Sequence, residues 1–133
     1  MSTTPAPTYN PVTVDKNGGD ISIKVSCPNY PQSISGQTWE YTGPGTSPVN
    51  NFPFSTAHPD NILGKPAATD KHLYLVDGAV LNQNDNPPTQ YQVQIEITQD
   101  GKQLALVLQP PNAPGQISNA DITISCKFQL IAA

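Results

Sequence analysis

The sequence contains no arginine and little charge of either sign. All six basic residues are lysines, charged residues make up 12% of the 133 positions, and the net charge is -4 at pH 7. Arginine is the side chain that grips phosphate in a bidentate manner, and domains that bind nucleic acid are usually basic. We therefore expect no nucleic-acid partner, and a surface that is polar through amides and hydroxyls rather than through charge.

Long apolar runs are also missing. No stretch approaches the roughly 18 consecutive apolar residues that a membrane-spanning helix needs, so we expect no membrane span. Residues 1–5 lack the charged and apolar regions of a signal peptide, and the chain as written is expected to be soluble. A signal peptide is removed from the mature protein, and Met1 would then be a cloned start, so the sequence does not specify the compartment.

Signals for helices and for known catalytic sites are scarce. The proline-free stretches favour β-branched and aromatic residues, and none has a sustained period of 3.6. The glycine-rich phosphate loop and the G-x-S-x-G motif of serine hydrolases are absent. The two histidines, His58 and His72, have no carboxylate at a recognised spacing, and the ten acidic residues are scattered singly. We expect a protein that is not an enzyme and that has no cofactor, except for a candidate calcium ion described below.

Alternation of apolar and polar residues is the main feature that is present. Residues 20–27 and 121–130 each place an apolar side chain at every second position, which is typical of half-buried strands. Residues 91–97 alternate in the same way, and Asp100-Gly101 then turns the chain into Leu104, Leu106 and Leu108. Because Ala105 and Val107 are apolar too, we expect this second arm to be a central strand that is covered on both faces.

Turn residues punctuate the rest of the chain. The segment 17–19, Asn-Gly-Gly, predicts a hairpin that places a strand at 12–14 beside the strand at 21–27. A strand is expected at 37–42, and one strand or two at 71–81, with Asp77-Gly78 as a turn in the second case. Residues 43–70 are rich in proline and glycine and predict a long irregular loop, which is either functional or packed as an Ω-like excursion.

These segments predict an all-β fold. About seven or eight strands with no room for helical crossovers indicate an antiparallel two-sheet β-sandwich of immunoglobulin-like or jelly-roll type, with a barrel as the second choice. Residues 1–10 are expected to form a flexible, proline-rich N-terminal tail, and residues 11–133 a single domain.

Cys27 and Cys126 both fall on the apolar faces of their strands. They form a disulfide if the first and last strands bring them together, and such a bridge would imply an oxidising compartment. The alternative is a pair of buried free thiols that act as small hydrophobic side chains. The sequence leaves both alternatives open.

One polar cluster offers hard oxygen ligands for a metal. Its members are Asp77, Asn82, Asn84, Asp85 and Asn86. Such oxygens suit calcium, although the cluster lacks the ordered frame and the distal Glu of an EF-hand, which predicts low affinity. The alternative is ordinary turn chemistry ahead of the two prolines at 87 and 88.

We therefore expect a non-catalytic binding module whose end loops hold a carbohydrate or a protein partner. Sugars are held by amide and carboxylate groups over an aromatic face. The candidate ligand-binding residues are Trp39, Tyr41, Asn50 and Asn51, with Asp85 and Asn86 as further candidates. The alternative for Trp39, the only tryptophan, is a place in the core.

A self-assembling subunit of a bacterial or phage surface structure is the alternative function. An extended proline-rich arm at the N-terminus is suited to adding a strand to a neighbouring subunit, which would make the protein a homo-oligomer.

Overall fold

The computed structural model describes residues 9–30, 32–81, 89–117 and 121–133, and within them it is almost entirely β. The described part of the chain contains eleven strands and one short helix, which confirms the all-β class but exceeds the seven or eight strands expected. The strands are β1 (Asn10–Val14), β2 (Ile21–Ser26), β3 (Ser33–Tyr41), β4 (Asn50–Ser55), β5 (Asp60–Gly64), β6 (Leu73–Leu81), β7 (Thr89–Tyr91), β8 (Val93–Gln99), β9 (Lys102–Gln109), β10 (Gly115–Ile117) and β11 (Ile122–Ala132), and the helix is α1 (Pro66–Thr69).

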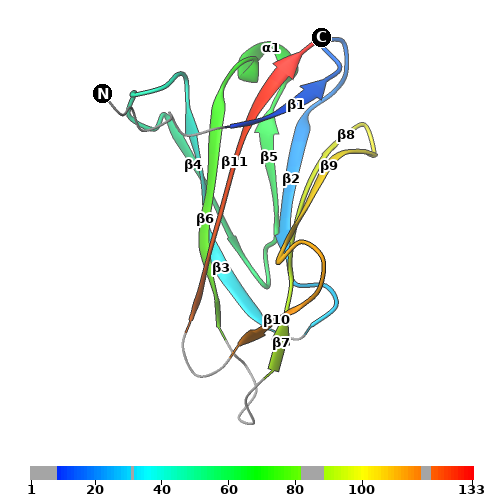
Figure 1. Ribbon diagram of the computed structural model, residues 1–133. Coiled ribbons are helices and arrows are strands. Elements are labelled where there is room, and N and C mark those ends of the chain that lie inside the picture. The colour runs from blue at the N-terminus through cyan, green and yellow to red at the C-terminus, as the bar shows by residue number, and fades with distance from the viewer. Residues whose placement is uncertain (1–8, 31, 82–88, 118–120) are drawn as a thin grey trace, which may run out of the picture.

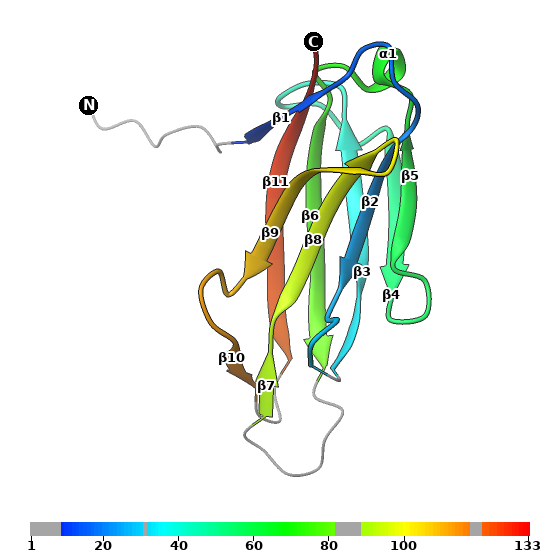
Figure 2. The ribbon, with the colours of Figure 1, turned by 90° about the vertical axis from the view of Figure 1, so that its right-hand side faces the viewer.

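Two sheets face each other in the manner of a β-sandwich (Figures 1 and 2). The five-stranded sheet has the order β1-β11-β6-β3-β4, and the four-stranded sheet has the order β5-β2-β8-β9. Neighbouring strands are antiparallel except β1 and β11, which run parallel, and β7 pairs with β10 in a separate two-stranded ribbon. The immunoglobulin-like or jelly-roll type of the sandwich stays a prediction.

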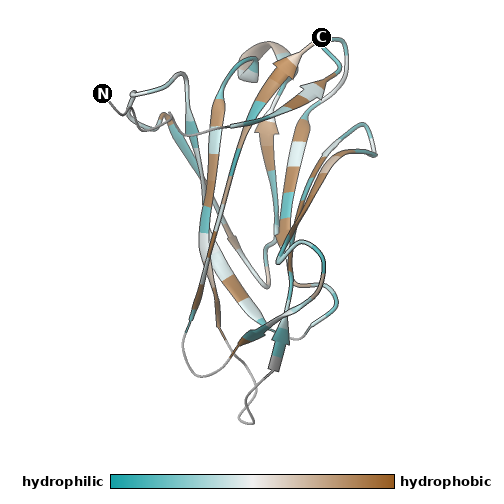
Figure 3. Ribbon diagram, in the orientation of Figure 1, coloured by the Kyte–Doolittle hydropathy of each residue, from teal (hydrophilic) through white to brown (hydrophobic). Residues whose placement is uncertain are grey.

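One hydrophobic core fills the space between the sheets. The alternating residues of β2 and β11 supply much of it, and Figure 3 shows this alternation along the strands. Tyr74 of β6 and Phe128 of β11 are fully buried there, with ring centroids 4.9 Å apart and planes 8° from parallel. Burying such a side chain contributes about 1.5–3 kcal/mol to the free energy of folding. The alternation places these side chains on one face of each sheet, and their burial stabilises the packing of the two sheets.

The hairpin predicted at residues 17–19 is wrong. β1 does not pair with β2 but crosses to the other sheet and lies beside β11. Gly18 and Gly19 do not adopt the positive φ that a tight hairpin turn needs. Instead, the Gln99 side chain holds the crossover by donating from Nε2 to the carbonyls of Asp15 at 2.8 Å and Gly19 at 3.1 Å. Both arrangements bury the same alternate residues, so the pattern could not distinguish them.

The second hairpin forms as predicted, but its arm β9 is not central. Asp100 and Gly101 take the positive φ of the turn, and β9 then lies at the edge of the four-stranded sheet. A β-bulge at Leu104 shifts the register, so Ala105 and Val107 pair with the core-facing Ile97 and Ile95. A shift of one residue exchanges the two faces of a strand, and the leucines that follow the bulge therefore point outward.

The loop predicted over residues 43–70 is largely ordered structure. It contains β4, β5 and α1. Pro53 lies in β4, which is tolerated because β4 is an edge strand and one of its sides needs no N–H donor. Of the two alternatives for residues 71–81, the structure has the single strand, because Gly78 lies in the middle of β6 opposite Gly36 of β3. A Cβ on either glycine would collide with the neighbouring backbone and the Phe54 ring.

The predicted N-terminal tail stays a prediction, because most of it is outside the described residues. β1 begins at Asn10, inside the segment expected to be flexible, while residues 1–8 lie outside the described part of the chain. The Tyr9 ring lies 5.8 Å from the Lys127 ammonium. Among the described residues there is no helix long and apolar enough to cross a membrane.

Candidate functional site

Trp39 lies on the outer face of the five-stranded sheet and is not a core residue. Its neighbours in β3, Thr38 and Glu40, are buried on the inner face, so the alternation of the strand turns the indole outward. Trp39 is half-buried and pairs in register with Asn51 of β4 and Leu75 of β6. The indole is therefore placed beside the polar residues that open β4.

A shallow pocket of about 240 Å³ adjoins this indole. It is lined by Trp39, Pro48, Val49, Asn50 and Asn51. Val49 is 57% exposed, and its N–H donates to the Glu40 carbonyl at 2.8 Å, which anchors the segment that forms the rim. The structure thus brings together three of the four residues predicted to bind a ligand, and none of the five lining side chains carries a charge.

The amide of Asn51 is held in place before any ligand arrives. Its Nδ2 donates to Oε1 of Gln37 at 2.5 Å on the same outer face. This bond leaves the Asn51 side-chain oxygen available as an acceptor. Tyr41, the fourth predicted residue, is half-buried on the same face opposite Leu73 and does not line the pocket.

A buried carboxylate on the inner face of β3 was missed by the sequence analysis. Oε2 of Glu40 accepts from the Tyr74 hydroxyl at 2.5 Å and contacts Nδ1 of His72 at 3.0 Å. Burial, together with the hydrogen bond and charge of Glu40, raises the pKa of Tyr74 far above its usual value. Lys71, the residue before His72, has a φ of 65°, which few residues other than glycine adopt.

This network joins β3 to β6 behind the Trp39 pocket. Glu40 and Tyr74 pair directly in the sheet, and His72 immediately precedes β6. The carboxylate is satisfied by two partners, as a buried charge requires, and the network therefore fixes the strand that carries Trp39. No signal in the sequence pointed to this network, because Trp39 and Tyr41 are the apolar residues of this segment and their alternation predicts Glu40 on the polar face.

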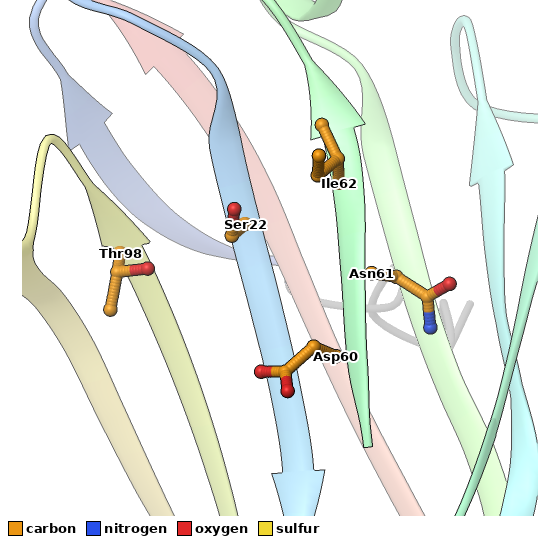
Figure 4. A pocket seen from close by; sticks show the side chains of 5 residues that line it. All are labelled: Ser22, Asp60, Asn61, Ile62 and Thr98. Atoms are coloured by element: carbon orange, nitrogen blue, oxygen red, sulfur yellow. The ribbon is translucent and has the colours of Figure 1, made fainter. Parts of the chain in front are cut away.

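The four-stranded sheet carries a second, larger pocket of about 630 Å³ on its outer face (Figure 4). It is lined by Ser22, Asp60, Asn61, Ile62 and Thr98, which come from β2, β5 and β8. The Asn61 amide is already engaged, because its Nδ2 donates to the Pro53 carbonyl at 2.8 Å. The pocket has no aromatic lining, so it lacks the flat face on which a sugar ring stacks.

The predicted calcium site stays a prediction, because only one of its five ligands belongs to the described residues. Asp77 is exposed on the outer face of β6, where it pairs with Gln37 and Ser125. The other four ligands, in the range 82–86, lie outside the described residues. In the described segments no three His, Cys, Asp or Glu side chains gather into a metal site.

Both cysteines are free thiols in the structure, so of the two alternatives the bridge does not form. Cys27 follows β2 and lies near Ile34 of β3, because the two residues line the same small pocket. Cys126 pairs with Val76 of β6, which in turn pairs with Thr38 of β3. Thr38 is four residues beyond Ile34, so Cys126 is displaced from the level of Ile34 by about 13 Å along the strand direction alone. A disulfide needs Cα atoms within about 7 Å.

Burial keeps these thiols protonated. It raises the pKa of Cys27 to about 11 and also raises that of Cys126. His58 is exposed, whereas His72 belongs to the Glu40 network.

No protein-family model, curated protein or solved structure matches this chain. A functional conclusion therefore has to come from the geometry of the site itself.

Proposed function

We propose that the protein is a non-catalytic module that binds a neutral carbohydrate in the Trp39 pocket. The observation that carries the proposal is the grouping of an outward indole with Asn50 and Asn51 in one uncharged pocket. An indole offers a flat apolar face for the C–H groups of a sugar ring, while amides donate and accept hydrogen bonds to its hydroxyls. The proposed ligand is neutral because the lining offers no charged partner.

Pre-organisation supports this use of the site. The Gln37 bond fixes the Asn51 amide, and the Glu40 network behind the pocket fixes β3. A side chain that is already ordered loses little conformational freedom when a ligand arrives. The pocket is nevertheless shallow, so the proposed binding to a single sugar unit is weak, and a longer glycan that runs across the sheet face gains from additional contacts.

A calcium ion is a separate part of the proposal, and the Trp39 pocket does not require it. Asp77 lies on the same outer face as Trp39, and its predicted co-ligands are in residues 82–86. If a calcium ion is held there, glycan binding falls when the ion is chelated. If glycan binding is independent of the ion, the Trp39 pocket acts alone.

A glycan-array screen tests this function. Labelled protein is applied to neutral and acidic glycans, once with calcium and once with a chelator. We expect saturable binding to neutral glycans that Trp39→Ala abolishes. The matched control is Ile62→Ala, which truncates an exposed side chain in the pocket of the other sheet and should bind normally. Equal loss in both variants, or no binding by the wild type, would contradict the proposal.

Self-assembly remains a second candidate function because one edge strand, β9, is open and apolar. The bacterial or phage origin and the exchanged N-terminal arm suggested by the sequence stay predictions. The compartment is likewise a matter for experiment.

A further inference from the structure

The edge strands of the two sheets differ in how they are protected. An unpaired edge invites pairing with another chain, and proteins block it with prolines, charges or short strands. β1 carries Pro11 and β4 carries Pro53, while β5 has five residues, begins at a charged aspartate and is tied to β4 through Asn61. β9 has eight residues, no proline, and a single charge at Lys102. It is the exception among the four edges.

The side chains of β9 also leave apolar surface uncovered. The register turns Leu106 and Leu108 away from the core, opposite the outward-facing Glu96 and Gln94 of β8. Leu106 is 41% exposed and Leu108 is half-buried. The open edge is therefore bordered by outward leucines, which would be covered if another strand were added to the sheet.

The sequence of this edge is nearly the same in both directions. Residues 103–109 read QLALVLQ. In an antiparallel pair centred on Leu106, the two Leu106 side chains lie opposite each other on the outer face, and Ala105 meets Val107 on the inner face; the bulge at Leu104 ends the regular pairing on that side. Lys102 falls outside the pair, so no like charges are opposed. Cross-strand pairs of this kind stabilise a sheet, whereas opposed like charges weaken it.

We propose that β9 pairs antiparallel with β9 of a second copy of this chain, with Leu106 on the two-fold axis. The two four-stranded sheets then become one eight-stranded sheet. The contact is isologous, because each copy uses the same surface, and it closes at the dimer.

This dimer does not depend on the proposed function. β9 belongs to the four-stranded sheet, whereas the Trp39 pocket lies on the outer face of the five-stranded sheet. Pairing through β9 leaves both Trp39 pockets open, and a dimer would present two of them to a repeating glycan, which raises avidity. Failure to bind glycans would leave the dimer proposal intact, and a monomer could still bind glycans.

Light scattering coupled to size-exclusion chromatography tests the dimer on the full chain over a wide concentration range. We expect a dimer whose dissociation constant rises at least about tenfold in Leu106→Lys, because two lysines then face each other across the axis. The matched control, Ile62→Lys, puts the same charge on an exposed position of the opposite edge strand and should dimerise like the wild type. Circular dichroism verifies that both variants fold. A wild type that is monomeric at every concentration overturns the proposal.

Cross-linking tests the position of the axis. Opposed residues of an antiparallel pair have Cβ atoms about 4.5–5.5 Å apart, close to the range that a disulfide spans. Leu106→Cys should therefore form a disulfide-linked dimer under mild oxidation, whereas Ile62→Cys should not. The native cysteines contribute little background because burial raises their pKa values. Equal cross-linking of the two variants, or a dimer that Leu106→Lys leaves unchanged, would contradict β9 pairing.

Discussion

Replacing Thr38 by valine should stabilise the protein. Thr38 is fully buried on the inner face of β3, and its hydroxyl has no hydrogen-bond partner among the described residues. A buried polar group without a partner costs about 1–3 kcal/mol, and valine has nearly the same shape without the hydroxyl. The free energy of unfolding should therefore rise by about 1–3 kcal/mol in Thr38→Val. For a domain of this size, each kcal/mol raises the melting temperature by about 3–5 °C.

The same substitution at Thr69 is the matched control. Thr69 is 2% exposed, but its Oγ1 donates to the Lys65 carbonyl at 2.9 Å. Losing that bond should lower the free energy of unfolding by about 1 kcal/mol. Urea denaturation followed by circular dichroism measures both variants. If Thr38→Val destabilises the protein as much as Thr69→Val does, the Thr38 hydroxyl has a partner and the reasoning is refuted.

Three further predictions concern the same core. Gly36→Ala should prevent stable folding, because its Cβ would overlap the β6 backbone, whereas Gly43→Ala should be neutral in thermal melts since nothing lies near its Cβ. Cys27 should react slowly with thiol reagents at neutral pH, and the alkylation rate of the folded protein should climb toward pH 11 as the thiolate forms. Tyr74→Phe should lower the free energy of unfolding by about 1.5–3 kcal/mol, because the Glu40 carboxylate loses the hydroxyl that donates to it, and an unchanged urea midpoint would contradict that network.

The sequence predicted the fold class because burial follows the alternation of residues. In β2 and β11, each position expected to face the core lies inside or at the border of the core. Alternation specifies which face of a strand is buried but not which strand lies beside it. The partner of β1 was therefore wrong, and the bulge at Leu104 changed the outward residues of β9.

The site was partly predictable for a similar reason. Trp39, Asn50 and Asn51 were candidates by residue type, and it is the pairing of β3 with β4 that brings them together. Reading residues 43–70 as a loop hid that pairing, because Pro53 was taken as a strand breaker although it lies in an edge strand. Glu40 was missed because its two partners, His72 and Tyr74, are more than thirty residues away in the chain.

Carbohydrate binding at Trp39 can be measured by fluorescence, since the sequence has one tryptophan and its emission reports on the proposed site alone. The folded protein is titrated with cello-, xylo-, manno- and chito-oligosaccharides, and Ile62→Ala serves as the control. We expect a saturable change in intensity or wavelength with at least one neutral glycan, with the same curve in the control. Emission that no glycan alters would contradict carbohydrate binding at Trp39.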